Sequence, residues 1–235
     1  MLLPLAYHIL LQLFFRHTLI LVWKDVLIDL RRKDNLLSVL LFSILTLLVF
    51  QFAMGEEPEV FLLALPGVIW IVFLMGGVLG LGKSYVQEME SGCMGGLLTS
   101  PVDRSVLFLG KMLANTISLL LTQLLFIPLC LFLFEVEVQN WLVLFLVLLF
   151  GTVGFSSLGT LLTAMTATVR GKEMLLPILI FPLMVPSLLC VVRLTDFLFF
   201  GSHPEEVWSW WKLLLGFDVV LFTLSLLGFE FVVEE

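Results

Sequence analysis

The chain has 235 residues, of which 60% are hydrophobic and 13% are charged, and its formal net charge is −7. This charged fraction is about half that of a soluble domain, which excludes a disordered chain and a soluble globular enzyme. The negative balance leaves no cationic surface for a nucleic acid. We therefore expect lipid to be the solvent for most of the chain.

The first 35 residues differ from the rest because polar side chains interrupt their apolar stretch. His8, Gln12 and Arg16 recur every four residues and would share one face of a helix. We expect residues 1–35 to form an amphipathic helix lying on the cytoplasmic leaflet. The alternative is that residues 5–23 cross the membrane as a further span. The second half is basic: Lys24, Arg31 and Arg32 are its candidate elbow residues, and Lys33 follows them.

Six continuous apolar runs follow in residues 36–235, each about as long as the roughly 20 residues that a transmembrane helix needs. Backbone groups in lipid must be paired within their own segment, so these runs are predicted to be helices. The predicted fold is therefore an all-α membrane protein with six transmembrane helices. The runs are Leu36–Met54, Val60–Gly82, Val106–Phe134, Trp141–Ala167, Met174–Val192 and Val207–Val233.

The few cations indicate the orientation of these helices. The connections at 55–59 and 135–137 contain no Lys or Arg, whereas ten of the twelve Lys and Arg residues fall on the opposite side. Only Arg193 and Lys212 fall on the far side, beside the fifth and sixth runs. The positive-inside rule then places both termini in the cytoplasm. An aromatic belt is expected at the outer interface, made of Trp141, Trp208, Trp210 and Trp211.

Residue types that carry catalysis are sparse in the predicted helices. The three histidines are scattered, and the three cysteines lie far apart in different segments. Gly82-Lys83-Ser84 lacks the glycine spacing and the preceding strand of a phosphate-binding loop. We therefore expect no catalytic residue, no metal site and no bound cofactor, and we interpret the chain as a transport subunit, a structural membrane protein or one part of a complex.

The cytoplasmic connection at 83–105 is the most patterned polar stretch. Glu88 and Glu90 begin a short helical piece, and Gly92 then relaxes the backbone. An apolar knob follows, formed by Leu97 and Leu98, before Pro101 breaks the chain ahead of the next run. One interpretation is a solvated loop. The other is a short helix that docks into the groove of a partner protein.

Three of the polar side chains inside the predicted helices are considered for a specific role. Asp218 is interpreted as an interfacial or protein-facing carboxylate paired with a neighbour, and the alternative is a role in a conformational switch. Asn115 and Gln123 are predicted to make hydrogen bonds between helices rather than to bind a substrate.

Prolines mark the fifth run. Pro177, Pro182 and Pro186 each remove a backbone hydrogen bond from their helix. We therefore expect this run to be bent, either as a movable element or simply as a distorted packed helix.

Several of these stretches resemble known transport subunits. Glu-x-Glu-x-Gly at 88–92 and Leu-Leu-x-Ser-Pro at 97–101 resemble the loop after the second span of type-2 ABC exporter permeases. Pro66-Gly67-Val68-Ile69-Trp70 and Pro182-Leu183-Met184-Val185-Pro186 look more specifically like the CcmB family of cytochrome c biogenesis. The resemblance covers about residues 23–231. It departs at Gly95-Gly96, where the family usually has a polar or acidic residue.

The resemblance implies a non-catalytic permease with an elbow helix at 23–34 before six spans. Such a subunit sits in the bacterial inner membrane and couples ATP hydrolysis by a CcmA-like ATPase to a change in membrane conformation. The implied partners also include CcmC-like and CcmD-like membrane proteins and a second copy of the chain. Haem is implied as a transported or relayed ligand of the complex, which releases haem-loaded chaperone CcmE.

Within this resemblance, the coupling residues are Glu88, Glu90, Gly92, Leu97, Leu98 and Pro101, with the acids facing basic groups of the ATPase and Leu97 filling an apolar pocket. Two other functions stay open at this stage. One is a permease for another substrate such as a lipid or a polysaccharide, and the other is an intramembrane enzyme or a haem-handling membrane protein that acts alone. Trp208, Trp210 and Trp211 near His203 fit either a haem contact or the interfacial belt.

Overall fold

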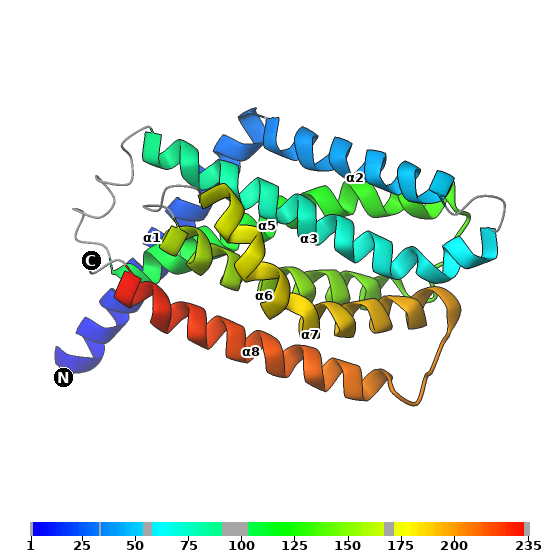
Figure 1. Ribbon diagram of the computed structural model, residues 1–235. Helices are drawn as coiled ribbons and strands as arrows, with labels where there is room; N and C mark the ends of the chain where they lie inside the picture. The colour runs from blue at the N-terminus through cyan, green and yellow to red at the C-terminus, as the bar shows by residue number, and fades with distance from the viewer. Residues whose placement is uncertain (1, 33, 54–57, 91–102, 167–171, 233–235) are drawn as a thin grey trace.

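The computed structural model describes residues 2–32, 34–53, 58–90, 103–166 and 172–232. Seven α-helices make up almost all of these ranges, and all but the first run side by side along one direction (Figure 1). The all-helical fold class is confirmed. The helices are α1 (Leu2–Arg32), α2 (Asp34–Ala53), α3 (Pro58–Glu90), α5 (Arg104–Leu133), α6 (Trp141–Thr166), α7 (Lys172–Phe200) and α8 (Val207–Val232).

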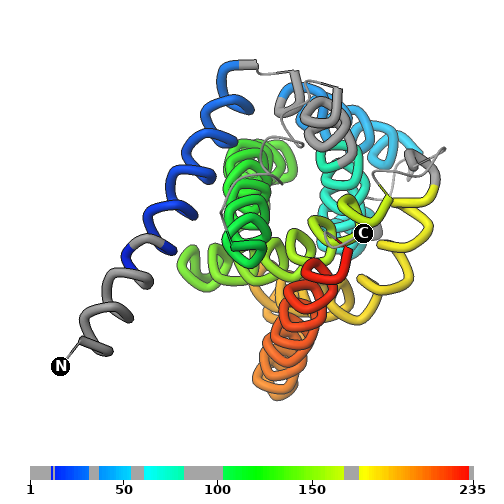
Figure 2. The backbone as a smooth tube through the Cα atoms, turned by 90° about the vertical axis from the view of Figure 1, so that its left-hand side faces the viewer, coloured from blue at the N-terminus to red at the C-terminus, as the bar shows by residue number. Residues whose placement is uncertain are grey.

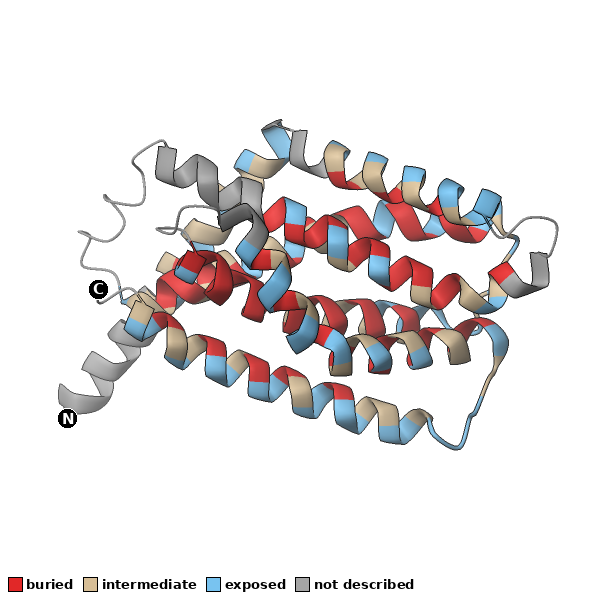
Figure 3. Ribbon diagram, viewed as in Figure 1, coloured by how far each residue is buried: buried red, intermediate tan, exposed pale blue. Residues whose placement is uncertain are grey.

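Five of the described helices, α3, α5, α6, α7 and α8, are long and apolar enough to cross a membrane. A shorter apolar segment, Leu37–Ala53, makes up most of α2. Buried residues line the inward faces of the helices, and the outward faces are exposed (Figure 3). These outward faces are themselves apolar, for example at Leu41 of α2 and Leu224 of α8. This arrangement suits a multi-pass protein with lipid around it.

Most helix positions agree with the apolar runs, but two helices extend well beyond theirs. α3 continues to Glu90 instead of stopping near Gly82, and α7 continues to Phe200 instead of stopping at Val192. Leu194 and Leu198 are each 1% exposed, so the last turns of α7 remain in the core. Arg193, the residue expected to flank the fifth span, lies on an exposed face of α7, and the helix continues for seven residues beyond it.

α7 ends just before a glycine with a left-handed backbone conformation. Gly201 has a φ of 69°, and its N–H donates to the carbonyl of Phe197 at 2.8 Å. This is the hydrogen bond of a helix that stops at a left-handed glycine. Three prolines lie inside α7, which stays one helix but changes direction along its length (Figure 1). The expected bend is therefore present.

α1 differs from the other helices in direction. Figure 2 looks along the bundle and shows α1 lengthwise, crossing the outside of α5 obliquely, whereas most other helices are seen close to end-on. α1 is one continuous helix from Leu2 to Arg32. Its exposed side chains include Phe15, Leu19 and Trp23.

α6 lies at the centre of the bundle and contacts α3, α5, α7 and α8. Small residues let these neighbours come close. Trp70 of α3 packs against Gly151, and Leu81 of α3 packs against Gly159. In the opposite sense, Phe155 of α6 packs against Gly77 of α3. Glycines on both helices therefore set the short distance between α3 and α6.

Candidate functional site

The predicted coupling element at 83–105 is described only at its two ends. α3 carries residues 83–90, so Glu88 and Glu90 lie in its last turn rather than at the start of a separate helix. α5 begins at Arg104, directly after Asp103. Gly92, Leu97, Leu98 and Pro101 lie outside the described residues. The docking role of these six positions therefore stays a prediction.

The second end of this element is attached to the end of α8. Ser105 Oγ donates to Glu230 Oε1 at 3.1 Å, and Arg104 Nη1 donates to the Glu230 carbonyl at 3.5 Å. Asp103 starts the helix through its own carbonyl, which accepts from Val106 N at 3.0 Å. The start of α5 and the last turn of α8 are thus joined at the surface.

α1 is held against α5 by a polar contact and a glycine. Ser118 Oγ donates to Asp29 Oδ2 at 2.7 Å. One turn earlier on the same face, Asp25 forms an ion pair with Lys24 at 2.9 Å. The Leu21 side chain lies 2.9 Å from where a Cβ on Gly110 would be. Of the predicted elbow cations, Arg31 is exposed, and the side chain of Arg32 is outside the described residues.

A small cavity of about 20 Å³ lies where α1 meets α3, α5 and α6. Its wall is half polar and half apolar, and Asp29 and Lys111 both contribute to it. This volume has room for about one water molecule. The lining residues are Asp25, Asp29, Leu81, Lys111, Ala114, Asn115, Thr160 and Thr163.

Hydrogen bonds between helices tie the interior together. Asn115 Nδ2 donates to Thr160 Oγ1 at 3.0 Å, which joins α5 to α6. Gln123 of α5 bonds Thr152 Oγ1 of α6 at 3.0 Å. The prediction that Asn115 and Gln123 make interhelical hydrogen bonds is confirmed.

The two CcmB-like motifs inside the membrane meet in space. Trp70 of α3 donates from Nε1 to Thr195 Oγ1 of α7 at 2.9 Å. Trp70 and Met184 line the same cavity of about 30 Å³ between α3, α5, α6 and α7. This cavity has room for about two water molecules, far less than a haem needs. Elsewhere in the motifs, a Cβ on Gly67 would have open space around it.

Asp218 lies on the buried side of α8. It is 6% exposed, and its carboxylate lies against α6 so closely that a Cβ on Gly154 would overlap Oδ1. Neither carboxylate oxygen has a hydrogen-bond partner among the described residues. Asp218 thus faces the protein as predicted, but the expected pairing with a neighbour is absent from the described part of the chain.

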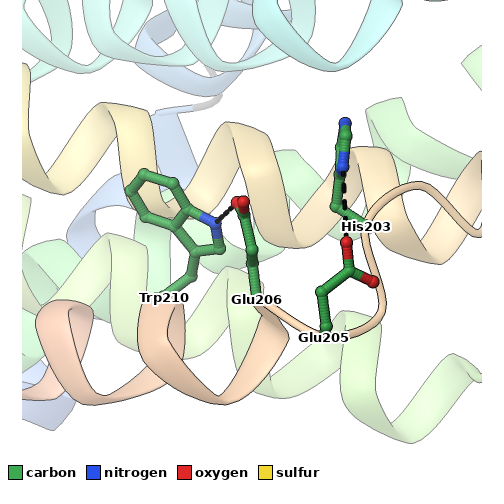
Figure 4. Close-up of polar contacts among 4 residues, drawn as sticks. All are labelled: His203, Glu205, Glu206 and Trp210. Carbon is green, nitrogen blue, oxygen red and sulfur yellow. Dashed lines mark hydrogen bonds and ion pairs between the residues drawn. The ribbon is translucent and has the colours of Figure 1, made fainter.

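The turn before α8 brings His203 near the tryptophans without directing them toward it. His203 Nδ1 lies 3.8 Å from Glu205 Oε1, whereas Trp210 Nε1 donates to Glu206 Oε2 at 3.2 Å (Figure 4). The remaining two tryptophans have other neighbours. Trp211 packs edge-on against Phe150, and Lys212 Nζ lies 5.6 Å from the Trp208 ring.

These contacts fit an interfacial belt, in which each ring has an apolar side and a polar end. Within the described residues, no three His, Cys, Asp or Glu side chains form a group that could hold a metal ion. The structure is thus a packed helical bundle in which the start of α5 and the last turn of α8 are joined at one end.

Comparison with known families gives the same relationship that the motifs suggest. The sequence model of the CcmB family, described as "CcmB protein", matches residues 16–234. The chain belongs to the CcmB family. The match starts within α1, so the second half of this helix is part of the family's common sequence.

Curated relatives carry one name, "Heme exporter protein B". The Haemophilus influenzae protein is 26% identical over 169 residues, which cover 72% of this chain and 76% of that protein. The Pseudomonas aeruginosa protein is 31% identical over 159 residues, covering 68% and 71%. The Rhodobacter capsulatus protein is 28% identical over 169 residues, covering 72% and 78%.

Two contacts between helices of this CcmB-family chain were not predicted from the sequence, that of α1 with α5 and that of α5 with the end of α8. Asp25 and Asp29 are four residues apart, which places them on one helix face and gave a signal for an inward-facing acidic pair. The contact of Ser105 with Glu230 joins residues 125 positions apart and had no local signal.

Proposed function

We infer that the chain is the membrane permease subunit of an ABC transporter complex that acts in haem export for cytochrome c biogenesis. The observation that carries this conclusion is the family match over residues 16–234. Three relatives named as heme exporter protein B support it, and each is covered over more than two thirds of its own length. The long apolar helices suit a multi-pass protein of the inner membrane.

The proposed topology has six spans, α2, α3, α5, α6, α7 and α8, preceded by α1 as an elbow helix. The oblique course of α1 across the outside of α5 supports this assignment (Figure 2). The start of α1, the end of α3 and the end of α8 lie at one end of the bundle (Figure 1). Arg16, Lys24 and Arg104 belong to this end, which the positive-inside rule makes cytoplasmic.

The proposed mechanism is mechanical coupling rather than catalysis by this chain. A CcmA-like ATPase would contact the element at 83–105, and nucleotide-driven closure would tilt the spans of two copies. α3 carries Glu88 and Glu90 beyond the apolar segment that ends at Leu81, which suits contact with a cytoplasmic partner. CcmC-like and CcmD-like proteins would bind the same complex, and haem would be its cargo.

Complementation tests the function itself. A bacterial strain that lacks its own CcmB-family gene is expected to regain covalently haem-loaded c-type cytochromes when this chain and its cognate ATPase are expressed. Haem-stained gels of periplasmic and membrane fractions measure the recovery. Insertion of the chain in the membrane without any recovery of haem-loaded cytochrome would contradict the proposed function.

Charge reversal tests the docking surface separately. The double variant Glu88→Lys/Glu90→Lys is expected to lose co-purification of the ATPase at least about 10-fold, because like charges would face each other across the contact. Glu135→Lys/Glu137→Lys is the matched control, since this pair has the same spacing at the opposite end of α5. Equal co-purification by both variants would contradict docking through Glu88 and Glu90.

A further inference from the structure

The buried stripe of α8 contains polar atoms without partners. Asp218 Oδ1, Asp218 Oδ2 and Ser225 Oγ make no hydrogen bond to any described residue. Asp218 is 6% exposed and Ser225 is 0% exposed, so neither side chain reaches solvent in this conformation. The whole stripe consists of Leu214, Asp218, Leu221, Ser225 and Phe229.

Leaving these groups without partners is costly. A buried polar group without a hydrogen bond loses its hydration and gains nothing in exchange, and the penalty is larger for a carboxylate. A serine inside a helix can donate to the carbonyl four residues earlier, but Ser225 makes no such bond. An ionised carboxylate accepts hydrogen bonds only, so in that form the carbonyls of its own helix cannot satisfy Asp218.

A single bound ion or water does not explain the stripe. Asp218 and Ser225 are seven residues apart, which is about 10 Å along a helix. At Gly154, the Asp218 carboxylate already occupies the space where a side chain would lie. The unsatisfied groups therefore belong to a surface that extends over two helical turns, not to one site.

α8 is attached to the bundle through one side only. Val219, Val220 and Leu224 are 65%, 52% and 60% exposed and form its outward face. α8 lies at the edge of the bundle in the view along the helices (Figure 2). Toward α6 some of its contacts are made at glycines, since Leu161 lies 3.2 Å from where a Cβ on Gly228 would be. The large side chains of the stripe, Leu221 and Phe229, pack into the core on either side of Ser225, so the polar positions interrupt an otherwise apolar contact.

We propose that the contact between α6 and α8 opens in a second conformation of the chain, in which water reaches Asp218 and Ser225. In the closed conformation these groups have no partners, and in the open conformation they are hydrated. The polar positions of the stripe thus lower the free-energy difference between the two conformations. This inference goes beyond the proposed function and does not depend on the identity of the cargo or the ATPase.

Thiol modification in membrane vesicles tests the opening. The reporter is Ser225→Cys in a full-length chain with Cys93, Cys130 and Cys190 replaced by serine. The matched control is Ser156→Cys in the same background, because Ser156 is also 0% exposed but bonds Met112 of α5 at 2.8 Å instead of facing α8. The probe is a charged methanethiosulfonate, which reacts with the thiolate in contact with water.

We expect the thiol at position 225 to react at least about 10-fold faster than the thiol at position 156, because only the first becomes hydrated on opening. Equal rates, whether both slow or both fast, would overturn the proposal.

If Ser225→Cys or Ser156→Cys fails to insert in the membrane, the natural cysteines provide a second test. Cys190 on α7 lies within electrostatic range of Asp218, whereas Cys130 on α5 lies in the core with Phe126 and Leu131. They are 2% and 0% exposed. With the other cysteines replaced, Cys190 is expected to react faster than Cys130, and a Cys190 that reacts no faster than Cys130 would overturn the proposal.

Discussion

α6 and α8 each have 26 residues and both bury polar side chains. The two helices differ in whether those buried side chains form hydrogen bonds. Every buried hydroxyl of α6 donates a hydrogen bond, five of them to carbonyls of α6 itself and Ser156 to α5. The two buried polar residues of α8 make none. The α6 hydroxyls are Thr152, Ser156, Ser157, Thr160, Thr163 and Thr166.

The difference shows that polarity alone does not weaken a helix in a membrane. A hydroxyl that donates to a carbonyl of its own helix needs no partner on a neighbouring helix. α6 can therefore contain many hydroxyls and still pack on all sides. A carboxylate has no such option. α6 therefore forms the fixed centre of the bundle, and α8 is the helix whose attachment is open to change.

The largest effect is expected at the glycine where the two helices touch. Gly154→Ala should lower the unfolding free energy by about 1–3 kcal/mol, because its Cβ overlaps Asp218 Oδ1 and pushes α8 away. Thermal unfolding in detergent measures this change. Gly216→Ala on α8 is the control, since a Cβ there meets nothing within 4 Å. Equal stability of the two variants would show that α8 does not pack against Gly154.

A gain in stability is expected from replacing the carboxyl group of α8 with an amide. Asp218→Asn keeps the shape of the side chain and should raise the unfolding free energy by about 1–2 kcal/mol, because an unpartnered carboxylate costs more to bury than an amide. Asp196→Asn, on a half-buried carboxylate of α7, should change it by less than about 0.5 kcal/mol. The same unfolding experiment measures both. A stability loss in Asp218→Asn would indicate that the carboxylate has a partner.

The smallest expected change in stability distinguishes a buried serine that donates a hydrogen bond from one that does not. Ser156→Ala should cost about 0.6 kcal/mol, the average value of a hydrogen bond between helices in a membrane. Ser225→Ala removes a hydroxyl without a partner and should leave the stability unchanged or slightly raised. Reversible unfolding in mixed micelles has the precision needed. If Ser225→Ala costs as much as Ser156→Ala, the contrast between α6 and α8 is wrong.

The sequence predicted the helices well because hydropathy reports directly on which segments lipid surrounds. α5, α6 and α8 begin and end within about two residues of their apolar runs. The fifth apolar run ends at Val192 because the charged Arg193 follows it, whereas α7 continues to Phe200. Gly201 and Pro204 marked its true end, and a helix can carry an exposed arginine on an outward face.

Contacts between helices were harder to predict, because they depend on how each helix is rotated toward its neighbours. Asn115 and Gln123 were foreseeable, since amides in lipid must find partners. The bond between Trp70 and Thr195 was not, because nothing local relates α3 to α7. Asp218 was recognised as exceptional, but its lack of a partner required the packing of α6 around it.

The bond between Ser105 and Glu230 has a consequence for how force travels through the protein. A pull on the chain at residue 103 would act on α5 directly and would reach the last turn of α8 by two routes, the exposed contacts of Glu230 and the buried rings of Phe108 and Phe229, whose centroids lie 5.4 Å apart. Exposed polar contacts contribute at most about 1 kcal/mol, so the buried rings carry the larger share of this connection. The end of α8 is therefore expected to move together with the start of α5.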